Sequence, residues 1–249
     1  MPPEFIFYVA LGALAGGFVN GFAGTGTGIF SLGFFLLVLE PSRAVGLVAL
    51  IAVISGVQGL FEVWPEIRQS ISRIRWFLIP GMIGVPIGVK LLSFVDASLL
   101  RLLVASILII FGGYFGFRSK LPKIEGVSVF ADSAVGFAGG VLSGLASLSG
   151  VPPTLWLSMR PWSKAQTRAI LQSFNFVLLS MTVMLLAWHG AYNKTTLWAM
   201  LIALPIGLIA AQLGIVVFRR VSDDQFRRLL ILLCLLCGVG LLLRQLLFE

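Results

Sequence analysis

The stretch Ala15-Gly-Gly-Phe-Val-Asn-Gly-Phe-Ala-Gly-Thr-Gly-Thr-Gly28 interrupts an apolar run with glycines, and a related stretch follows about 123 residues later. The second reads Ala138-Gly-Gly-Val-Leu-Ser-Gly-Leu-Ala-Ser-Leu-Ser-Gly-Val-Pro152. Two glycine-interrupted hydrophobic segments at corresponding positions of two halves indicate the binding site of a secondary transporter.

The composition predicts an all-α integral membrane protein. The chain has 249 residues, of which 58% are hydrophobic and 11% charged, and its mean hydropathy is +1.02. This is more apolar surface than one soluble core buries. Apolar runs of about 17 to 25 residues recur without the alternating period of a membrane barrel, so helices are expected to cross the lipid bilayer.

The net charge of +8 reflects orientation in the membrane rather than binding to nucleic acid, because the basic residues lie in short loops between apolar runs. The N-terminal Met-Pro-Pro-Glu-Phe lacks the basic region of a signal peptide, so the chain from Phe5 onward is expected to be structural. The two cysteines, Cys234 and Cys237, are one helical turn apart and imply no disulfide framework.

The apolar runs predict five helical segments in each half. They lie near 5–23, 28–39, 44–61, 76–93, 98–117, 128–148, 151–159, 165–188, 195–218 and 225–247. The charged loop at 118–126 is a cytoplasmic linker between a first transmembrane repeat at 1–117 and a second at 127–249.

The repeat extends beyond the glycine stretches. Ser42-Arg-Ala44 matches Ser163-Lys-Ala165 at an offset of 121. At an offset of 126 a further set of small and basic residues recurs, with Gly81, Gly84, Gly88, Arg101 and Gly112 matching Gly207, Ala210, Gly214, Arg227 and Gly238. A fused duplication explains both offsets.

Loop charge favours inverted over parallel repeats. If each half crosses the membrane an even number of times, the 18 basic residues divide into 8 and 10. If each half crosses an odd number of times, they divide into 13 inside and 5 outside, as the positive-inside rule requires. Both termini are then expected on the non-cytoplasmic side of the inner membrane.

The segments 28–39 and 151–159 are too short for ordinary crossings, with helical lengths of ~18 Å and ~14 Å at 1.5 Å per residue. A re-entrant hairpin or a short, tilted span is expected for each. Non-helical backbone at this depth is tolerated only inside the protein or along a cavity, so both glycine breaks are expected to face the interior.

Each break exposes free backbone N–H groups and a positive helix end, which suit a small anion. Hydroxyl groups at Thr25, Thr27, Ser31, Ser147 and Ser149 add neutral donors. Three glycines within the five positions 24–28 cost about 1 kcal/mol each in helix propensity, which favours a functional break. The glycines within the helices have an alternative reading as close helix contacts, which we favour for Gly16, Gly17, Gly21, Gly139, Gly140 and Gly144.

Acidic residues argue against a cation transporter. All ten lie at predicted span ends or in loops, whereas proton relays and cation sites usually place Asp or Glu at mid-membrane. No metal site, cofactor or catalytic residue is predicted.

Polar residues enter the segment after the second break at Arg168, Gln172 and Asn175, within two helical turns and on a similar face. Arg168 has two readings, as an anion ligand or as an interfacial anchor that reaches the headgroups. Asn20, Ser55 and Gln58 are possible counterparts in the first half, and His189 is expected at the interface. Because the second break has more side-chain polarity nearby, the anion is expected closer to that break.

These features together resemble the TauE/SafE family of sulfite exporters over almost the whole chain. The glycine-rich turn Gly24-Thr-Gly-Thr-Gly28 matches the family pattern but lacks its proline, whereas Ser147-Leu-Ser-Gly-Val-Pro152 keeps the proline and loses glycines. The resemblance implies a bacterial inner-membrane permease of two repeats that exports sulfite, sulfoacetate or other small sulfur-containing anions.

The sequence therefore predicts a non-enzymatic permease with a small anionic substrate, working by alternating access. The predicted substrate-binding residues are Asn20, Gly24, Thr25, Gly26, Thr27, Gly28, Ser147, Ser149, Gly150, Arg168, Gln172 and Asn175. Two alternatives remain open, a thiol-redox carrier using the Cys-x-x-Cys pair and a passive anion channel. Large apolar faces make a homodimer possible, and no nucleic-acid partner is expected.

Overall fold

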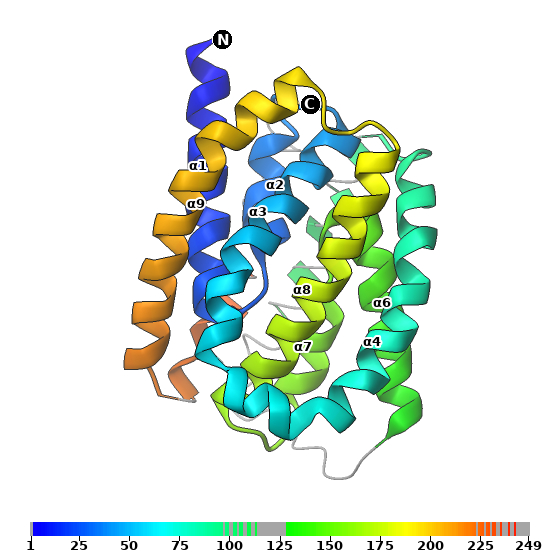
Figure 1. The fold of residues 1–249 in the computed structure, drawn as a ribbon, viewed down its shortest axis with the longest axis vertical. Coiled ribbons are helices and arrows are strands. Elements are labelled where there is room, and N and C mark those ends of the chain that lie inside the picture. The colour runs from blue at the N-terminus through cyan, green and yellow to red at the C-terminus, as the bar shows by residue number, and fades with distance from the viewer. Residues whose placement is uncertain are drawn as a thin grey trace.

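The computed structural model describes residues 2–96 and 128–222 continuously, with scattered positions between 98 and 113 and between 224 and 242. Within these residues the chain is helical throughout (Figure 1). Its elements are α1 (Pro3–Ala23), α2 (Thr27–Phe35), α3 (Pro41–Glu62), α4 (Trp64–Leu92), α6 (Val129–Ala146), α7 (Val151–Ser158), α8 (Lys164–Trp188) and α9 (Lys194–Arg220). The linker at 118–126 and the two cysteines lie outside the described residues, as do most of the spans predicted at 98–117 and 225–247.

Six of the described helices, α1, α3, α4, α6, α8 and α9, are long and apolar enough to cross a membrane. The predicted all-α membrane fold is thus confirmed, and most helix bounds lie within three residues of those expected. The two short helices have 9 residues in α2 and 8 in α7, which correspond to only ~14 Å and ~12 Å of rise. Neither reaches across a bilayer as a helix.

The interval 62–75, between the spans predicted at 44–61 and 76–93, was expected to be a loop, and this was wrong because helix α4 already begins at Trp64. The first turns of α4 lie across the lower end of the molecule in Figure 1, before the helix turns upward. The guanidinium of Arg68 lies 5.4 Å from the Trp64 ring centroid, and that of Arg75 lies 4.9 Å from the Trp76 ring. Arginine and tryptophan together are typical of a helix at the membrane–water interface, so charge alone did not indicate a loop here.

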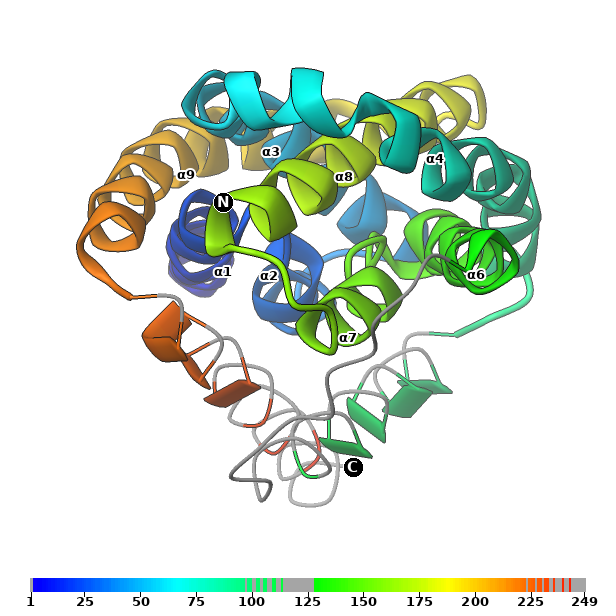
Figure 2. The same cartoon turned by 90° about the horizontal axis from the view of Figure 1, so that it is seen from below.

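The long helices form two groups of opposite direction. In Figure 1, α1, α3 and α9 run downward, whereas α4, α6 and α8 run upward. The most extensive contacts join α1 to α9 and α4 to α6. The first helix of each half, α1 or α6, therefore packs on the fourth helix of the other half, α9 or α4. Helices α3 and α8 cross between the halves and are among the most buried. Figure 2 shows α2 and α7 at the centre, between α1 and α6.

Glycines bring the backbones of α1 and α9, and those of α4 and α6, into direct contact. A Cβ atom at Gly17 would lie 2.8 Å from the Cα of Gly207, and one at Gly140 would lie 2.8 Å from the Cα of Gly81. These are the same pair of positions in the two repeats, at offsets of 123 and 126.

The next turn of each helix pair repeats this arrangement. A Cβ at Gly21 would lie 2.7 Å from the Cα of Ala211, and one at Gly144 would meet the backbone oxygen of Val85, the residue that matches Ala211 at the offset of 126. Gly16 and Gly139 instead meet the short helix or the break of their own half, since their Cβ atoms would lie 3.0 Å from Thr27 O and 2.7 Å from Ser149 O. The packing reading of these glycines is confirmed.

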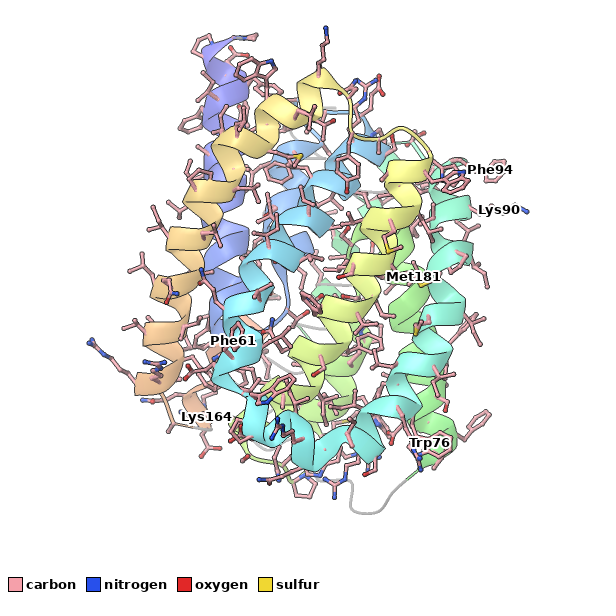
Figure 3. All side chains as sticks on the ribbon, viewed as in Figure 1. Phe61, Trp76, Lys90, Phe94, Lys164 and Met181 are labelled. Carbon is pink, nitrogen blue, oxygen red and sulfur yellow. The ribbon has the colours of Figure 1, made fainter. Side chains whose placement is uncertain are left out.

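The outer surface of the helices is apolar. Phe61 and Phe94, labelled in Figure 3, point outward and are each 77% exposed. Lys90 projects from the upper end of α4 in the same view. Exposed aromatic and aliphatic side chains over this much of the surface suit contact with lipid tails rather than water.

Candidate functional site

Both helix breaks use the left-handed backbone conformation. Gly24 has φ of 76° and its N–H donates to the carbonyl of Asn20 at 2.8 Å, which ends α1. Gly26 has φ of 100° and precedes the first turn of α2. In the second half the position matching Gly24 is Ser147, which takes φ of 55° after α6. The first break is therefore opened by glycine and the second by a residue with a side chain.

The two breaks touch each other. A Cβ at Gly28 would lie 2.9 Å from the carbonyl carbon of Ser147, and a Cβ at Gly150 would lie 2.6 Å from the Cβ of Thr25. Thr25 is 4% exposed and Ser147 is 3% exposed. The expected interior position of the breaks is thus observed, and the N-terminal ends of α2 and α7 share one buried contact.

Arg168 carries a buried charge beside this contact. Its side chain is 0% exposed, and its Nη2 donates to the carbonyl of Gly21 at 2.6 Å. Its guanidinium lies 4.0 Å from the ring centroid of Phe218. The Nε and Nη1 atoms are buried and have no hydrogen-bond partner. The reading of Arg168 as an anchor that reaches the headgroups is wrong, because an anchor of that kind leaves its guanidinium exposed.

Two buried amides lie near the same break. Asn20 Nδ2 donates to Ala52 O at 3.1 Å and to Ser55 Oγ at 2.8 Å. Gln172 Nε2 donates to Gly56 O at 2.8 Å. The other atom of each amide, Asn20 Oδ1 and Gln172 Oε1, is buried without a partner. Asn20, Ser55 and Gln172 therefore form one polar group across α1, α3 and α8.

The hydroxyl groups differ in their availability. The Thr27 Oγ1 atom is buried and has no partner. Ser31 donates to Gly12 O at 2.7 Å, and Ser147 donates to Val45 O at 2.9 Å. Ser149 donates to Asn175 Oδ1. The hydrogens of these three serines are thus already used within the protein, whereas Thr27 faces the first break with a free hydroxyl.

Arg168 and Asn175 lie at different breaks. A Cβ at Gly24 would lie 3.2 Å from Arg168 Cγ, so Arg168 faces the first break, whereas Asn175 bonds to Ser149 in the second. The expectation that the Arg168 side chain lies near the second break was wrong. Helix α8 crosses between the halves, and its first turns pass the end of α1 before its middle reaches the second break.

Several residues of this region had no sequence prediction. Gly56 and Gly59 on α3 leave room for the Gln172 amide, since their Cβ atoms would lie 3.1 Å from Nε2 and 2.8 Å from Cδ. Ser55 and Gly59, four residues apart, form the small-xxx-small pattern, which could have indicated close contact with a neighbour. Phe218 supplies the aromatic face beneath Arg168, and a phenylalanine in an apolar helix gives no sequence signal for such a role.

A buried ion pair between Asp132 and Arg160 lies away from the breaks. Asp132, in the first turn of α6, accepts from Trp156 Nε1 at 2.6 Å and lies 3.5 Å from Arg160 Nη2. The position of Asp132 at a helix start agrees with the predicted placement of acidic residues at span ends. Over the described part of the chain, no group of three His, Cys, Asp or Glu side chains could hold a metal ion.

Two sets of polar contacts join the end of α9 to its neighbours, α3 and α8. Arg219 donates to both carboxylate oxygens of Glu62, with Nε–Oε1 at 2.9 Å and Nη2–Oε2 at 2.6 Å. Lys164 Nζ donates to Phe218 O at 3.2 Å and to Val221 O at the end of α9. The C-terminal end of α9 is therefore held to both α3 and α8.

Comparison with known proteins gives the family. The family model described as sulfite exporter TauE/SafE matches residues 8–241. The chain belongs to the TauE/SafE family. A probable sulfite/organosulfonate exporter TauE of Cupriavidus necator is 24% identical over 193 residues, covering 74% of this chain and 75% of that protein. Membership of an exporter family and the six long apolar helices together indicate a multi-pass membrane transporter.

Proposed function

We propose that this TauE/SafE protein exports a small sulfur-containing oxyanion, such as sulfite or an organosulfonate, through the contact between the two breaks. The observation that carries the proposal is Arg168, a wholly buried cation with two unpartnered nitrogens beside the first break. A buried charge is costly unless it is paired, and Glu62, the described carboxylate whose charge acts on Arg168, already accepts two hydrogen bonds from Arg219. An anionic substrate would pair it.

The anion would be held mainly by the first break. Arg168 supplies the charge, Thr27 Oγ1 is a neutral donor, and the N-terminal end of α2 adds the positive end of its helix dipole. Asn20 and Gln172 complete the surroundings from α1 and α8. Ser147, Ser149, Gly150 and Asn175 belong to the facing second break, where they position the backbone against Thr25 and Gly28.

Transport would proceed by alternating access between two inverted repeats. The opposite directions of α1 and α6, of α3 and α8, and of α4 and α9 support inversion. The matching glycine contacts in the two exchanged helix pairs support it independently. A rocking of the two bundles, α1–α3–α9 against α4–α6–α8, would open the breaks to one side and then to the other.

The proposed orientation in the inner membrane places both termini on the non-cytoplasmic side. The first turns of α4, the start of α8 and the end of α9 share the lower end in Figure 1 and hold Arg68, Arg73, Arg75, Lys164, Arg219 and Arg220. The opposite end, with the start of α1, holds Arg43, Lys90 and Lys194. The excess of basic residues at the lower end supports its assignment to the cytoplasm.

Reconstituted proteoliposomes test the proposal. We expect the wild-type chain to release entrapped sulfite with saturable kinetics and counterflow, and Gly26→Leu and Arg168→Ala to abolish both. Lys90→Ala, at an exposed helix end, is the matched control and should retain transport. Unchanged sulfite and sulfonate flux in both site variants would show that the site is wrongly assigned.

The same assay separates the alternatives. A passive channel would show neither saturation nor counterflow. A variant in which Cys234 and Cys237 are both replaced by alanine should transport normally, and loss of transport would instead favour the thiol-redox reading. The homodimer also stays a prediction, which the mass of the purified protein in detergent would test.

A further inference from the structure

We propose that the site selects an oxyanion of single charge that carries its own hydrogen-bond donor, such as the hydrogen form of sulfite or a hydroxyalkanesulfonate. This inference rests on the proposed function and deepens it. It arises from the unpartnered atoms around the first break, which include acceptors as well as donors: Arg168 Nε and Nη1, Thr27 Oγ1, Asn20 Oδ1 and Gln172 Oε1.

The charge of the site favours a monoanion. Arg168 is the cation that faces the first break, from α8. The charged groups at the neighbouring helix ends are engaged elsewhere, with Arg219 bound to Glu62 and Lys164 bound to carbonyls at the end of α9. The single guanidinium that borders the break balances one negative charge on a ligand bound there. A dianion would leave a net buried charge, which carries a large desolvation penalty.

The amide orientations require a donor on the ligand. Each amide already donates its nitrogen to a backbone carbonyl, Asn20 to Ala52 and Gln172 to Gly56. Rotating either amide by 180° would place its oxygen against that carbonyl oxygen, so the observed orientations are fixed by these bonds. Asn20 Oδ1 and Gln172 Oε1 are thereby held as free acceptors. A ligand with only acceptor oxygens would leave both unsatisfied in a buried place.

The acceptors and the cation lie within reach of one small ligand. A Cβ at Gly24 would lie 2.7 Å from Gln172 Oε1 and 3.2 Å from Arg168 Cγ, so both side chains border the same glycine. A Cβ at Gly56 would lie 3.1 Å from Gln172 Nε2 and 3.7 Å from Asn20 Nδ2, so the two amides also adjoin. An anion bound between Arg168 and Gly24 therefore has Gln172 Oε1 at its other end, with the Asn20 amide next to it.

Two sulfonates of equal size and charge test the donor requirement. The probes are 2-hydroxyethanesulfonate and 1-propanesulfonate, which differ by a hydroxyl in place of a methyl group. We expect the hydroxyl compound to compete about tenfold better for sulfite flux in proteoliposomes, because an unsatisfied buried acceptor is costly. Sulfate, a dianion without a donor at neutral pH, should compete about 100-fold less well than 2-hydroxyethanesulfonate.

Variants test whether the two amide oxygens cause the preference for the hydroxyl compound. Gln172→Met and Asn20→Leu each remove one amide oxygen and should lower the preference for the hydroxyl compound. Ser143→Ala is the matched control: Ser143 is the counterpart of Asn20 at an offset of 123, is equally buried and bonds to Thr182. Its preference should equal that of the wild type.

Equal or better competition by 1-propanesulfonate, or by sulfate, in a chain that transports sulfite would overturn this inference and leave the proposed function standing. Retention of the full preference in both Gln172→Met and Asn20→Leu would also overturn it. Absence of flux for sulfite and for every sulfonate would overturn the proposed function itself, and with it this inference.

Discussion

Replacing Arg168 by methionine is expected to stabilise the protein while abolishing transport. The arginine is wholly buried, with one hydrogen bond to Gly21 O and one aromatic contact with Phe218. Methionine is an unbranched side chain that fills much of the same space without a charge. The substitution therefore separates the effect of the buried cation on protein stability from its role in transport.

The magnitude follows from the groups that are lost. Removing a charge-assisted hydrogen bond costs about 1.5–3 kcal/mol, and removing a desolvated cation–π contact costs about 2 kcal/mol. Against this, the buried cation carries an effective penalty of several kcal/mol, and its Nε and Nη1 atoms add about 1–3 kcal/mol each as unsatisfied donors. The balance favours Arg168→Met by about 1–4 kcal/mol, or a rise in Tm of roughly 2–4 °C per kcal/mol.

The assay combines thermal unfolding in detergent with sulfite efflux from proteoliposomes. Leu47→Met is the matched control, because Leu47 is the counterpart of Arg168 at an offset of 121 and is also 0% exposed. That exchange conserves volume and should change stability by less than about 1.5 kcal/mol, with transport retained. A lower Tm together with normal efflux in Arg168→Met would refute the reasoning, since the arginine would then be structural.

Three further substitutions probe the breaks and the lower end. Gly28→Ala places a methyl group 2.9 Å from the Ser147 carbonyl carbon and should destabilise by about 1–3 kcal/mol in thermal unfolding, whereas Gly113→Ala meets no atom within 4 Å and should not. Ser147→Gly should be more stable than Ser147→Ala by about 1 kcal/mol, because both lose the bond to Val45 but only glycine adopts φ of 55° without strain; equal Tm values would contradict this. Glu62→Gln should lower stability by less than about 1 kcal/mol, since Arg219 is largely exposed, and a larger loss of Tm would show that the pair carries more than a surface contact.

The helical framework could be predicted from sequence because apolar length and glycine pattern act locally. The positions of the breaks at Gly24–Gly28 and Ser147–Gly150 could be predicted because their residues have low helix propensity. The packing role of Gly17 and Gly140 followed from small-residue spacing, and their contact with backbone is observed. Among the described helices, the predicted end of α2 was four residues too late, and the start of α4 was misplaced by twelve because charge at the interface resembles charge in a loop.

The interior of the site depended on tertiary contacts that no local pattern encodes. The facing of Arg168 toward the first break depends on how α8 crosses between the halves, and its contact with Phe218 joins residues far apart in the chain. The serine hydroxyls were expected to be free donors, yet Ser147 and Ser149 already donate to Val45 and Asn175. The residue type indicated a polar side chain, but whether its hydroxyl is free to bind a ligand depends on the residues that surround it in the fold.

The exchange of helices between the halves has an evolutionary consequence. Because α1 packs on α9 and α6 packs on α4, the matching glycines Gly17 and Gly140 are each covered by the other half. A single ancestral repeat would have exposed this glycine and the open backbone of its break within the bilayer. With the inverted repeats that we propose, it would have paired with an identical chain inserted in the opposite orientation, and gene fusion would then have allowed one copy to gain Arg168 while the other kept Leu47.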